Sequence, residues 1–188
     1  MNTIGTLIQQ FNRPTRVLDF LVPLIGDKKD VKIADIGSGP ISVIGNSLDG
    51  VNVQVFPSDI KDFGSFWLEN KMVQFLPIEI QDMERLTYEN NFFDIVTTTN
   101  ALDHTMDAIS AVKEMIRVTK IGGWIHIDCH LDQLSTGHKH RWNTKKDGRF
   151  ISKYNTFDLK DFGFKIDFID NGGLSRYNRI VALLQKHE

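Results

Sequence analysis

The sequence is poor in cysteine and lacks long apolar runs. Its one cysteine, Cys129, excludes an internal disulfide and a cysteine-rich zinc site, and predicts a reducing, cytoplasmic location. Because no stretch is apolar over the length of a bilayer, and no secretory signal is recognisable at the start, we expect no membrane partner. A formal net charge of -2 likewise gives no reason to expect long nucleic acid as a partner.

What the sequence does contain is ordinary for a globular protein, with 41% hydrophobic and 24% charged residues. A length of 188 residues suits one well-buried domain. We therefore expect a single domain over residues 1–188, in which helices within 1–29 cover a core formed by 30–188.

Strand-like and helix-like segments alternate along the core, which predicts an α/β fold with a mostly parallel sheet of about seven strands. Pro77 places the third strand at a sheet edge, because proline cannot donate to a central ladder. The last two strands flank an Asn171-Gly172-Gly173 turn and should form an antiparallel hairpin. The expected strands are 31–36, 51–56, 76–80, 92–99, 124–129, 164–169 and 180–184.

Helices are expected between these strands. The clearest is 103–119, whose apolar residues recur at three- and four-residue spacing and which should end at Gly122-Gly123. The last, 156–162, should be capped by Thr156 and stopped by Gly163. The remaining expected helices lie within 4–25, 41–48 and 63–73.

A glycine-rich turn follows the first strand. Asp35 lies near the carboxyl end of that strand, and Gly37 and Gly39 come directly after it. In an open α/β sheet, ligands bind outside the carboxyl ends of the strands, and glycine lets the backbone approach a ligand closely. The pattern predicts a nucleotide-like ligand over residues 37–39, although two glycines alone are also typical of an ordinary surface turn.

Four motifs in order resemble those of the class I S-adenosylmethionine-dependent methyltransferases, and of their UbiE-type members in particular. They are Asp35-Ile36-Gly37-Ser38-Gly39, Asp59 at the end of the second strand, residues 81–86 followed by 91–96, and residues 114–123. The resemblance covers roughly residues 30–185. It implies a Rossmann-like, doubly wound sheet, S-adenosylmethionine as the cofactor and methyl transfer as the reaction.

The resemblance also implies which residues hold the cofactor. Asp59 would accept the ribose hydroxyls, and Ile60 would pack on the adenine. Asp82 would accept from the adenine amino group, while the backbone N–H of Met83 donates to the ring. The glycine turn would lie against the methionine part, whose amino-acid end touches Asn100. The full expected set is Asp35, Gly37, Ser38, Gly39, Asp59, Ile60, Asp82, Met83 and Asn100.

The sequence departs from the family at Ile41, where the third glycine usually stands, which leaves the detailed cofactor pose open. Simpler interpretations also exist, because Asp35 could only anchor backbone N–H groups and Asp82 could cap a turn. A dinucleotide ligand is a competing interpretation. Its fingerprint requires a third glycine where Ser42 stands, and it explains neither Asp82 nor the terminal hairpin.

By the same resemblance, the acceptor side should lie after the fourth and fifth strands. His104, beside Asp103, is a candidate general base, although we favour a structural role in which Asp103 caps the following helix. His126, Asp128 and His130 share one strand face, but residues two apart are about 7 Å from each other, so we expect no metal there. His126 should be a buried histidine bonded to backbone. Asp128 and His130 are the other catalytic candidates.

Residues 137–149 hold the only concentration of basic residues in the chain. Within it, we expect Arg141 to bind oxyanions and Trp142 to stack on the acceptor, with His138 and His140 beside them. This composition predicts an anionic or sugar-like acceptor. A solvated loop is the other interpretation, since charged residues are ordinary in loops.

Two missing motifs narrow the acceptor. The Asn/Asp-Pro-Pro-aromatic motif of amino-methylating nucleic-acid enzymes is absent from residues 100–103, and no proline precedes Cys129 to form a Pro-Cys nucleophile. A small molecule methylated at oxygen remains. The compact chain also permits another class of function, in which a catalytically silent relative binds the cofactor or serves as a subunit of a larger complex.

Overall fold

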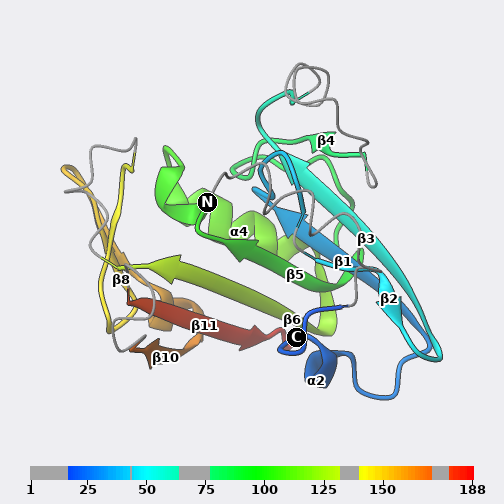
Figure 1. The fold of residues 1–188 in the computed structure, drawn as a ribbon. Helices are drawn as coiled ribbons and strands as arrows, with labels where there is room; N and C mark the ends of the chain where they lie inside the picture. Colours follow the sequence, from blue (N-terminus) through cyan, green and yellow to red (C-terminus); the bar gives the residue numbers. More distant parts are fainter. Residues whose placement is uncertain (1–16, 43, 64–76, 132–139, 171–177) are drawn as a thin grey trace, which may run out of the picture.

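The computed structural model describes residues 17–42, 44–63, 77–131, 140–170 and 178–188. Their central feature is an eight-stranded sheet with the order β10-β11-β6-β5-β1-β3-β2, in which β4 also pairs with β3 (Figure 1). Its strands are β1 (Asp30–Ile36), β2 (Ser47–Leu48), β3 (Val51–Asp59), β4 (Glu79–Ile80), β5 (Phe93–Thr99), β6 (Thr119–His130), β10 (Lys165–Ile169) and β11 (Arg179–Gln185).

The middle of the sheet is parallel, with β1 pairing to β3 and β5, and β5 pairing to β6. Burial is most complete in β5, where every residue but the last is buried, whereas β3 alternates apolar and polar residues. The chain ends with β11 inserted antiparallel between β6 and β10. The predicted α/β fold, a mostly parallel sheet with an antiparallel C-terminal hairpin, is therefore confirmed. Among the described residues, β4 pairs only with β3, as expected for the edge strand after Pro77.

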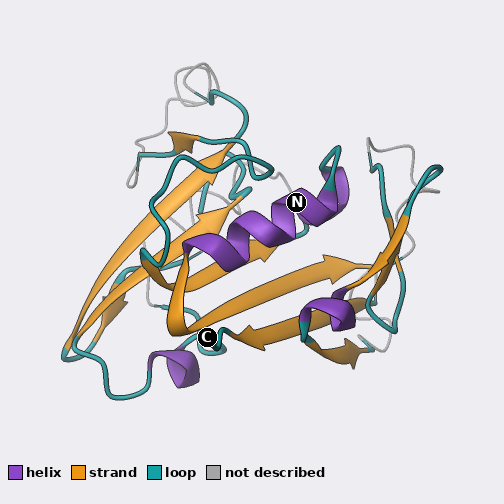
Figure 2. Ribbon diagram, turned by 180° about the vertical axis from the view of Figure 1, so that it is seen from behind, coloured by secondary structure: helices purple, strands orange, loops and turns teal. Residues whose placement is uncertain are grey.

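One face of the sheet is covered by α4 (Ala108–Val118), which Figure 2 shows lying across the strands. The helix begins later than predicted. Asp107 is its N-cap and accepts from the backbone N–H groups of Ile109 and Ser110, whereas the preceding Leu102–His104 forms the 3-10 turn η1. The prediction that Asp103 caps this helix is wrong. The helix ends at Thr119, where β6 begins at once, so Gly122-Gly123 lies inside a strand.

Two other predicted helices are absent from the described residues. Where a helix over 41–48 was expected, β2 instead pairs with β3 as an antiparallel hairpin. The Asp49-Gly50 turn joins the two strands, and such a dipeptide favours a tight two-residue hairpin. In 156–162, β9 (Thr156–Asp158) is followed by the 3-10 turn η3 (Leu159–Phe162), with Asp158 as its cap in place of Thr156. Gly163 ends this turn with a φ of 90°, as predicted.

A second, three-stranded sheet was not predicted. It is formed by β7 (Asn143–Thr144), β8 (Arg149–Ile151) and β9, in the order β7-β8-β9. At the other end of the chain, α2 (Val22–Ile25) is the described part of the expected N-terminal helices. Residues 17–21, also expected within these helices, are not α-helical, and the expected helical residues 4–16 and 64–73 lie outside the described residues. No described helix is long and apolar enough to cross a membrane.

Alternation along β1 divides the hydrophobic core between the two faces of the sheet. Ala34 and Ile36 belong to the cluster that includes α4, while Val31 and Ile33 belong to a second cluster that includes Ile25 of α2. Successive side chains of a strand point to opposite faces, so one strand contributes to both layers. The sheet is thus held from both sides, and its carboxyl edge has a fixed position.

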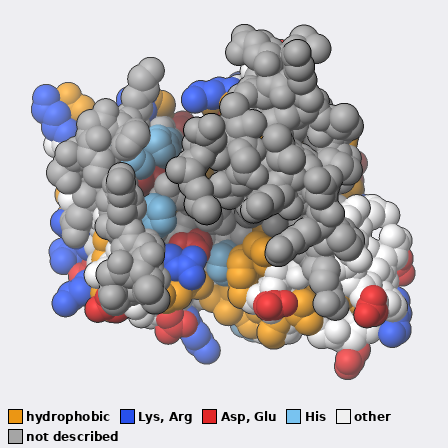
Figure 3. Space-filling view, viewed as in Figure 1, with side chains coloured by type: hydrophobic (Ala, Val, Ile, Leu, Met, Phe, Trp, Pro, Cys, Tyr) orange, Lys and Arg blue, Asp and Glu red, His pale blue; other side chains and the backbone are white. Residues whose placement is uncertain are grey.

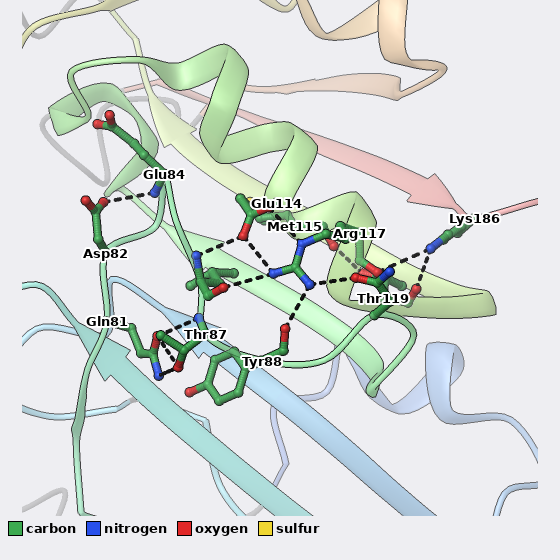
Figure 4. Close-up of polar contacts among 12 residues, drawn as sticks. Gln81, Asp82, Glu84, Thr87, Tyr88, Glu114, Met115, Arg117, Thr119 and Lys186 are labelled. Atoms are coloured by element: carbon green, nitrogen blue, oxygen red, sulfur yellow. Dashed lines mark hydrogen bonds and ion pairs between the residues drawn. The ribbon is translucent and has the colours of Figure 1, made fainter.

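The last turn of α4 also fastens the segment between β4 and β5, as Figure 4 shows. The Arg117 guanidinium donates to the backbone oxygens of Leu86 (2.9 Å) and Tyr88 (2.8 Å), and to the Glu114 carboxylate (2.8 Å). Glu114 in turn accepts from the backbone N–H of Leu86 at 2.8 Å. Since Asp82 and Met83 belong to the same segment, Arg117 fixes the residues expected to contact the adenine.

We expect Arg117→Ala to lower the free energy of unfolding by about 1–2 kcal/mol, because two backbone oxygens lose a charged donor at a partly exposed site. Arg117→Lys should recover less than half of the loss, since one ammonium cannot reach the same set of acceptors. Urea unfolding measures both changes. Arg149→Ala, which removes an exposed ion pair with Asp147, is the matched control and should change stability by less than about 0.5 kcal/mol.

Candidate active site

The glycine turn after β1 is tied to the end of β3. The backbone N–H groups of Gly37 and Ser38 both donate to the backbone oxygen of Ser58, at 2.8 and 2.9 Å. Gly37 and Gly39 have φ values of 74° and 68°, which favour glycine. A Cβ on Gly37 would lie 2.5 Å from the Cβ of Ala101, whereas a Cβ on Gly39 would meet no described residue within 4 Å. As far as the described residues go, the space over Gly39, where the cofactor is expected, is therefore open.

Asp59 stands beside this open space at the end of β3. One carboxylate oxygen accepts from the backbone N–H of Gly39 at 3.1 Å, and the other accepts from the backbone N–H of Lys61 at 3.0 Å. An ionised carboxylate has about four acceptor positions, so this half-buried group retains capacity for ribose hydroxyls. Next to it, the side chain of Ile60 is 63% exposed, as a surface that packs on a ligand ring would be.

Asp35 is buried, and the Ser42 hydroxyl donates to its carboxylate at 2.6 Å. Among the described residues, the partner of this carboxylate is thus a side chain and not the backbone N–H groups of the simpler interpretation. Burial raises the pKa of Asp35 to about 6, against the lowering effect of the Ser42 hydroxyl, and the charge of Asp59 raises it further. A positively charged ligand group nearby would favour the ionised form, so this carboxyl is suited to an ammonium or sulfonium.

The segment before β5 approaches the same turn. Met83 is buried, and its Cε would lie 3.2 Å from a Cβ on Gly37. Asp82 is exposed and accepts from the backbone N–H of Glu84 at 3.0 Å, so it does cap a turn. This bond uses only part of the acceptor capacity of a carboxylate, which leaves room for the expected adenine contact.

Asn100 joins the ends of β5 and β6. Its φ of 53° is in the left-handed region, its backbone N–H donates to the backbone oxygen of Asp128 at 2.7 Å, and its side-chain oxygen accepts from the backbone N–H of His130 at 3.3 Å. The candidate cofactor and acceptor residues of the two strands are therefore held against each other.

Asp103 pairs with a residue far away in the sequence. Its fully buried carboxylate lies 2.6 Å from Nδ1 of His140, and 4.0 Å from Nε2 of its neighbour His104. The two histidine rings lie with their centroids 4.3 Å apart. His140, which we expected only to bind substrate, is therefore the partner of Asp103, and His104 lies beside this pair with a side chain that is 43% exposed.

The fifth-strand candidates have different surroundings from one another. His126 is buried, bonds to the Thr97 hydroxyl at 3.0 Å and stacks on a phenylalanine ring, so its expected partner was of the wrong kind. Burial, together with the charge of Arg179, lowers the pKa of His126 to about 4. Asp128 forms an ion pair with Arg179, and burial raises the pKa of its carboxyl. Arg179 was missed, although its place at the start of the last strand could have indicated a position beside β6. His130 is half-buried and pairs with Arg179 in the sheet register.

A cleft of about 910 Å³ lies between α4 and the three-stranded sheet. Arg141 lines it and is exposed. Trp142 also lines it but is only 3% exposed, because its indole N–H donates to the Thr105 backbone oxygen at 3.0 Å and its ring packs on Phe157. His138 lies outside the described residues. The charged side chains that line the cleft are Arg141, Lys113, Lys145, Lys153 and Asp107, with His140 beside them. In the view of Figure 3, histidine side chains gather on the left half of the surface, with basic side chains along its left margin.

Comparison with known proteins decides the family. A family model described as a methyltransferase domain matches residues 35–127, which run from the buried Asp35 to the end region of β6. The chain belongs to the class I S-adenosylmethionine-dependent methyltransferases. Proteins of this family use S-adenosylmethionine as the methyl donor, so the dinucleotide interpretation does not hold.

Among curated relatives, this methyltransferase domain is 31% identical over 105 residues to the ubiquinone/menaquinone biosynthesis C-methyltransferase UbiE of Coxiella burnetii. The match covers 56% of the chain but only 34% of that relative, so the chain spans about a third of its length.

Two solved structures share the fold at low identity. One is a chain in the complex of the Haloferax volcanii Trm112 methyltransferase activator with a methyltransferase, at a TM-score of 0.65 and 10% identity, covering 98% of this chain and 95% of that one. The other is the CurJ carbon methyltransferase, at a TM-score of 0.58 and 16% identity, covering 84% and 49%.

The raised pKa of Asp35 gives a testable pH dependence. Because the folded protein holds this proton more tightly than the unfolded chain, the carboxyl contributes stability that increases as the pH falls through about 6. Between pH 7.5 and 4.5, we expect the wild-type free energy of unfolding to rise by about 2 kcal/mol relative to that of Asp35→Asn. Urea unfolding of both proteins at the two pH values measures this difference. Parallel pH profiles would show that the Asp35 carboxyl titrates normally.

Proposed function

We propose that this chain binds S-adenosylmethionine over the carboxyl ends of β1 and β3 and transfers its methyl group to a small-molecule acceptor. The observation that carries the proposal is the open space over Gly39 beside the Asp59 carboxylate. Family membership supports the donor. The conversion of an acceptor by this particular chain is the proposed step.

Each cofactor residue is proposed to contact one part of the donor. In this proposal Asp59 accepts the ribose hydroxyls, and the exposed Ile60 packs on the adenine. Asp82 and the backbone N–H of Met83 bind the edge of the ring, and the loop that carries them is fixed by Arg117. Asp35, the turn over residues 37–39 and Asn100 would hold the methionine part. The bound donor supplies a methyl group on a positively charged sulfur, which an acceptor atom displaces in line.

The acceptor is proposed to bind in the cleft between α4 and the three-stranded sheet. Among the described residues, four basic side chains and one acidic side chain line it, which favours an anionic or sugar-like molecule. Arg141 would contact the anionic group, with Trp142, His140 and His138 on the same side. The catalytic candidate His104 follows β5, and the candidates Asp128 and His130 lie at the carboxyl end of β6, where they would orient the acceptor and exclude water.

Oxygen and carbon are both candidate acceptor atoms. Oxygen follows from the missing motifs of nucleic-acid enzymes, and it would require removal of a hydroxyl proton. Carbon is favoured by the similarity to UbiE and CurJ, both of which are carbon methyltransferases. The acceptor residues proposed above serve either atom, and the fragment masses of a methylated product distinguish them.

The alternative is a catalytically silent subunit that binds the cofactor. A structural neighbour in complex with an activator is compatible with such an assembly. The basic cleft between α4 and the three-stranded sheet supports the enzyme, because a silent binding module has no need for an acceptor site. Turnover of any acceptor by the purified chain alone would exclude the silent alternative.

The donor site is tested by calorimetric titration with S-adenosylhomocysteine, with NAD as the control ligand. We expect binding of the first and none of the second. Asp59→Ala should weaken binding by at least about tenfold, because it removes charge-assisted hydrogen bonds to the ribose. Asp30→Ala, the same change at the amino end of β1, should leave affinity unchanged. Equal affinities of the Asp59 variant and the wild type would refute the ribose assignment.

The acceptor cleft is tested by a screen of small phenolic, carboxylate and phosphate-bearing molecules with S-adenosylmethionine, read by the gain of a methyl group in mass spectrometry. For an anionic acceptor, Arg141→Ala should raise KM about tenfold, since a charge-assisted contact is lost, while S-adenosylhomocysteine affinity stays the same. Lys165→Ala, an exposed basic residue on β10, is the matched control. An unchanged KM in the Arg141 variant would place the acceptor elsewhere.

A further inference from the structure

We propose that Asp103, His104 and His140 form a binding site for one divalent transition-metal ion, of which Zn²⁺ is the representative. Each of the three can offer one ligand atom, and these atoms all lie within 4.8 Å of one another. Two imidazoles and a carboxylate are a donor set that suits zinc, cobalt and iron. The position of the site does not depend on the proposed methyl transfer.

The buried carboxylate provides a second observation that points to a cation. Asp103 is fully buried, and among the described residues its Oδ1 has no hydrogen-bond partner. This oxygen lies 4.0 Å from Nε2 of His104, which is another member of the cluster. An unpaired carboxylate oxygen in the interior carries a desolvation cost, and a cation placed between it and the two rings would offset that cost.

The distances allow an ion after small side-chain movements. In a tetrahedral site, ligand atoms about 2.0–2.2 Å from the ion lie roughly 3.4 Å apart, so atoms within 4.8 Å of one another would have to approach by up to roughly 1.5 Å. His104 is 43% exposed and can turn toward the ion. His140 Nδ1 and Asp103 Oδ2 are already joined by a hydrogen bond of 2.6 Å, so an ion bound between these residues would take the place of the proton of that bond.

The fold holds His140 in place beside Asp103 and His104 before any ion binds. Backbone N–H groups of Arg141 and Trp142 donate to the Asp103 backbone oxygen at 2.8 and 3.1 Å. The indole N–H of Trp142 adds a bond to the Thr105 backbone oxygen at 3.0 Å. These three bonds fix the residues that follow His140 to the turn that carries Asp103 and His104. Such preorganisation lowers the entropic cost of assembling the site.

The neighbouring row of His126, Asp128 and His130 does not offer the same site. His126 Nδ1 is bonded to the Thr97 hydroxyl and Asp128 Oδ2 is paired with Arg179, so each of these residues already has a ligand atom engaged. Three protein ligands, in contrast, leave a coordination position open for water or another oxygen. His140 lines the basic cleft, so that position would be near the proposed acceptor site. Only this last point rests on the proposed function: an acceptor oxygen bound there would lose its proton more easily.

The test uses the full chain, freed of metal with a chelator, and titrates it with Zn²⁺ by calorimetry and with Co²⁺ by visible absorption. We expect one ion per chain and a cobalt spectrum with nitrogen and oxygen ligands. Asp103→Asn and His140→Ala should each weaken Zn²⁺ binding by at least about tenfold, the loss typical of disturbing even a hydrogen-bonding partner of a ligand. His187→Ala, an exposed histidine near the chain end, is the matched control and should bind as the wild type does.

Asp103→Asn retains an oxygen that can accept from His140, which keeps the fold testable by circular dichroism if the alanine variant does not fold. Absence of Zn²⁺ binding, or equal affinity in the wild type and Asp103→Asn, would overturn the site. Unchanged affinity in His104→Ala would overturn the three-ligand set, since a histidine that acted only as a base would not change ion binding. S-adenosylhomocysteine titration of the same samples reports the donor site separately, so failure of one proposal is distinguishable from failure of the other.

Discussion

Parallel pairing of β1 with β3 on one side and β5 on the other determines where the candidate cofactor residues at the ends of these strands lie. In parallel strands the carboxyl ends meet at one edge, and each strand is followed here by a polar or glycine-containing segment. The bonds from the Gly37 and Ser38 N–H groups to Ser58 then close the turn over that edge. A ligand surface is thereby assembled from segments that are distant in the sequence, without any of them being long.

The strands of this sheet were predictable because short segments rich in β-branched and aromatic residues, some of them alternating with polar residues, lie between turn-forming residues such as Gly37, Gly50 and Asn100. The local features that went wrong involve short polar segments. The Asp49-Gly50 turn forms a hairpin where a helix was expected. Asp107 caps α4 in place of Asp103, because the side chain of Asp107 accepts from the backbone N–H groups of the first turn. The pairing of Asp103 with His140 joins residues 37 positions apart, and no sequence periodicity reports such a contact.

Three buried carboxylates near the carboxyl edge illustrate how one chemical group is stabilised in different ways. Asp35 has a hydroxyl partner and a pKa raised to about 6, so it is poised to respond to a positive charge. Asp128 is compensated by the guanidinium of Arg179. Asp103 has an imidazole on one oxygen and no partner on the other among the described residues. These differences in compensation, more than residue type, assign each carboxyl a separate role.

The helix α4 touches two regions of the molecule with different turns. Residues of its first turns line the basic cleft, whereas Glu114 and Arg117 near its end hold the segment that contains Asp82 and Met83. Because these turns are separate in the sequence, substitutions can accumulate at one end without disturbing the other. A lineage of such proteins could therefore diversify the molecules it accepts while retaining the same donor, with a single helix serving as both the variable and the invariant part.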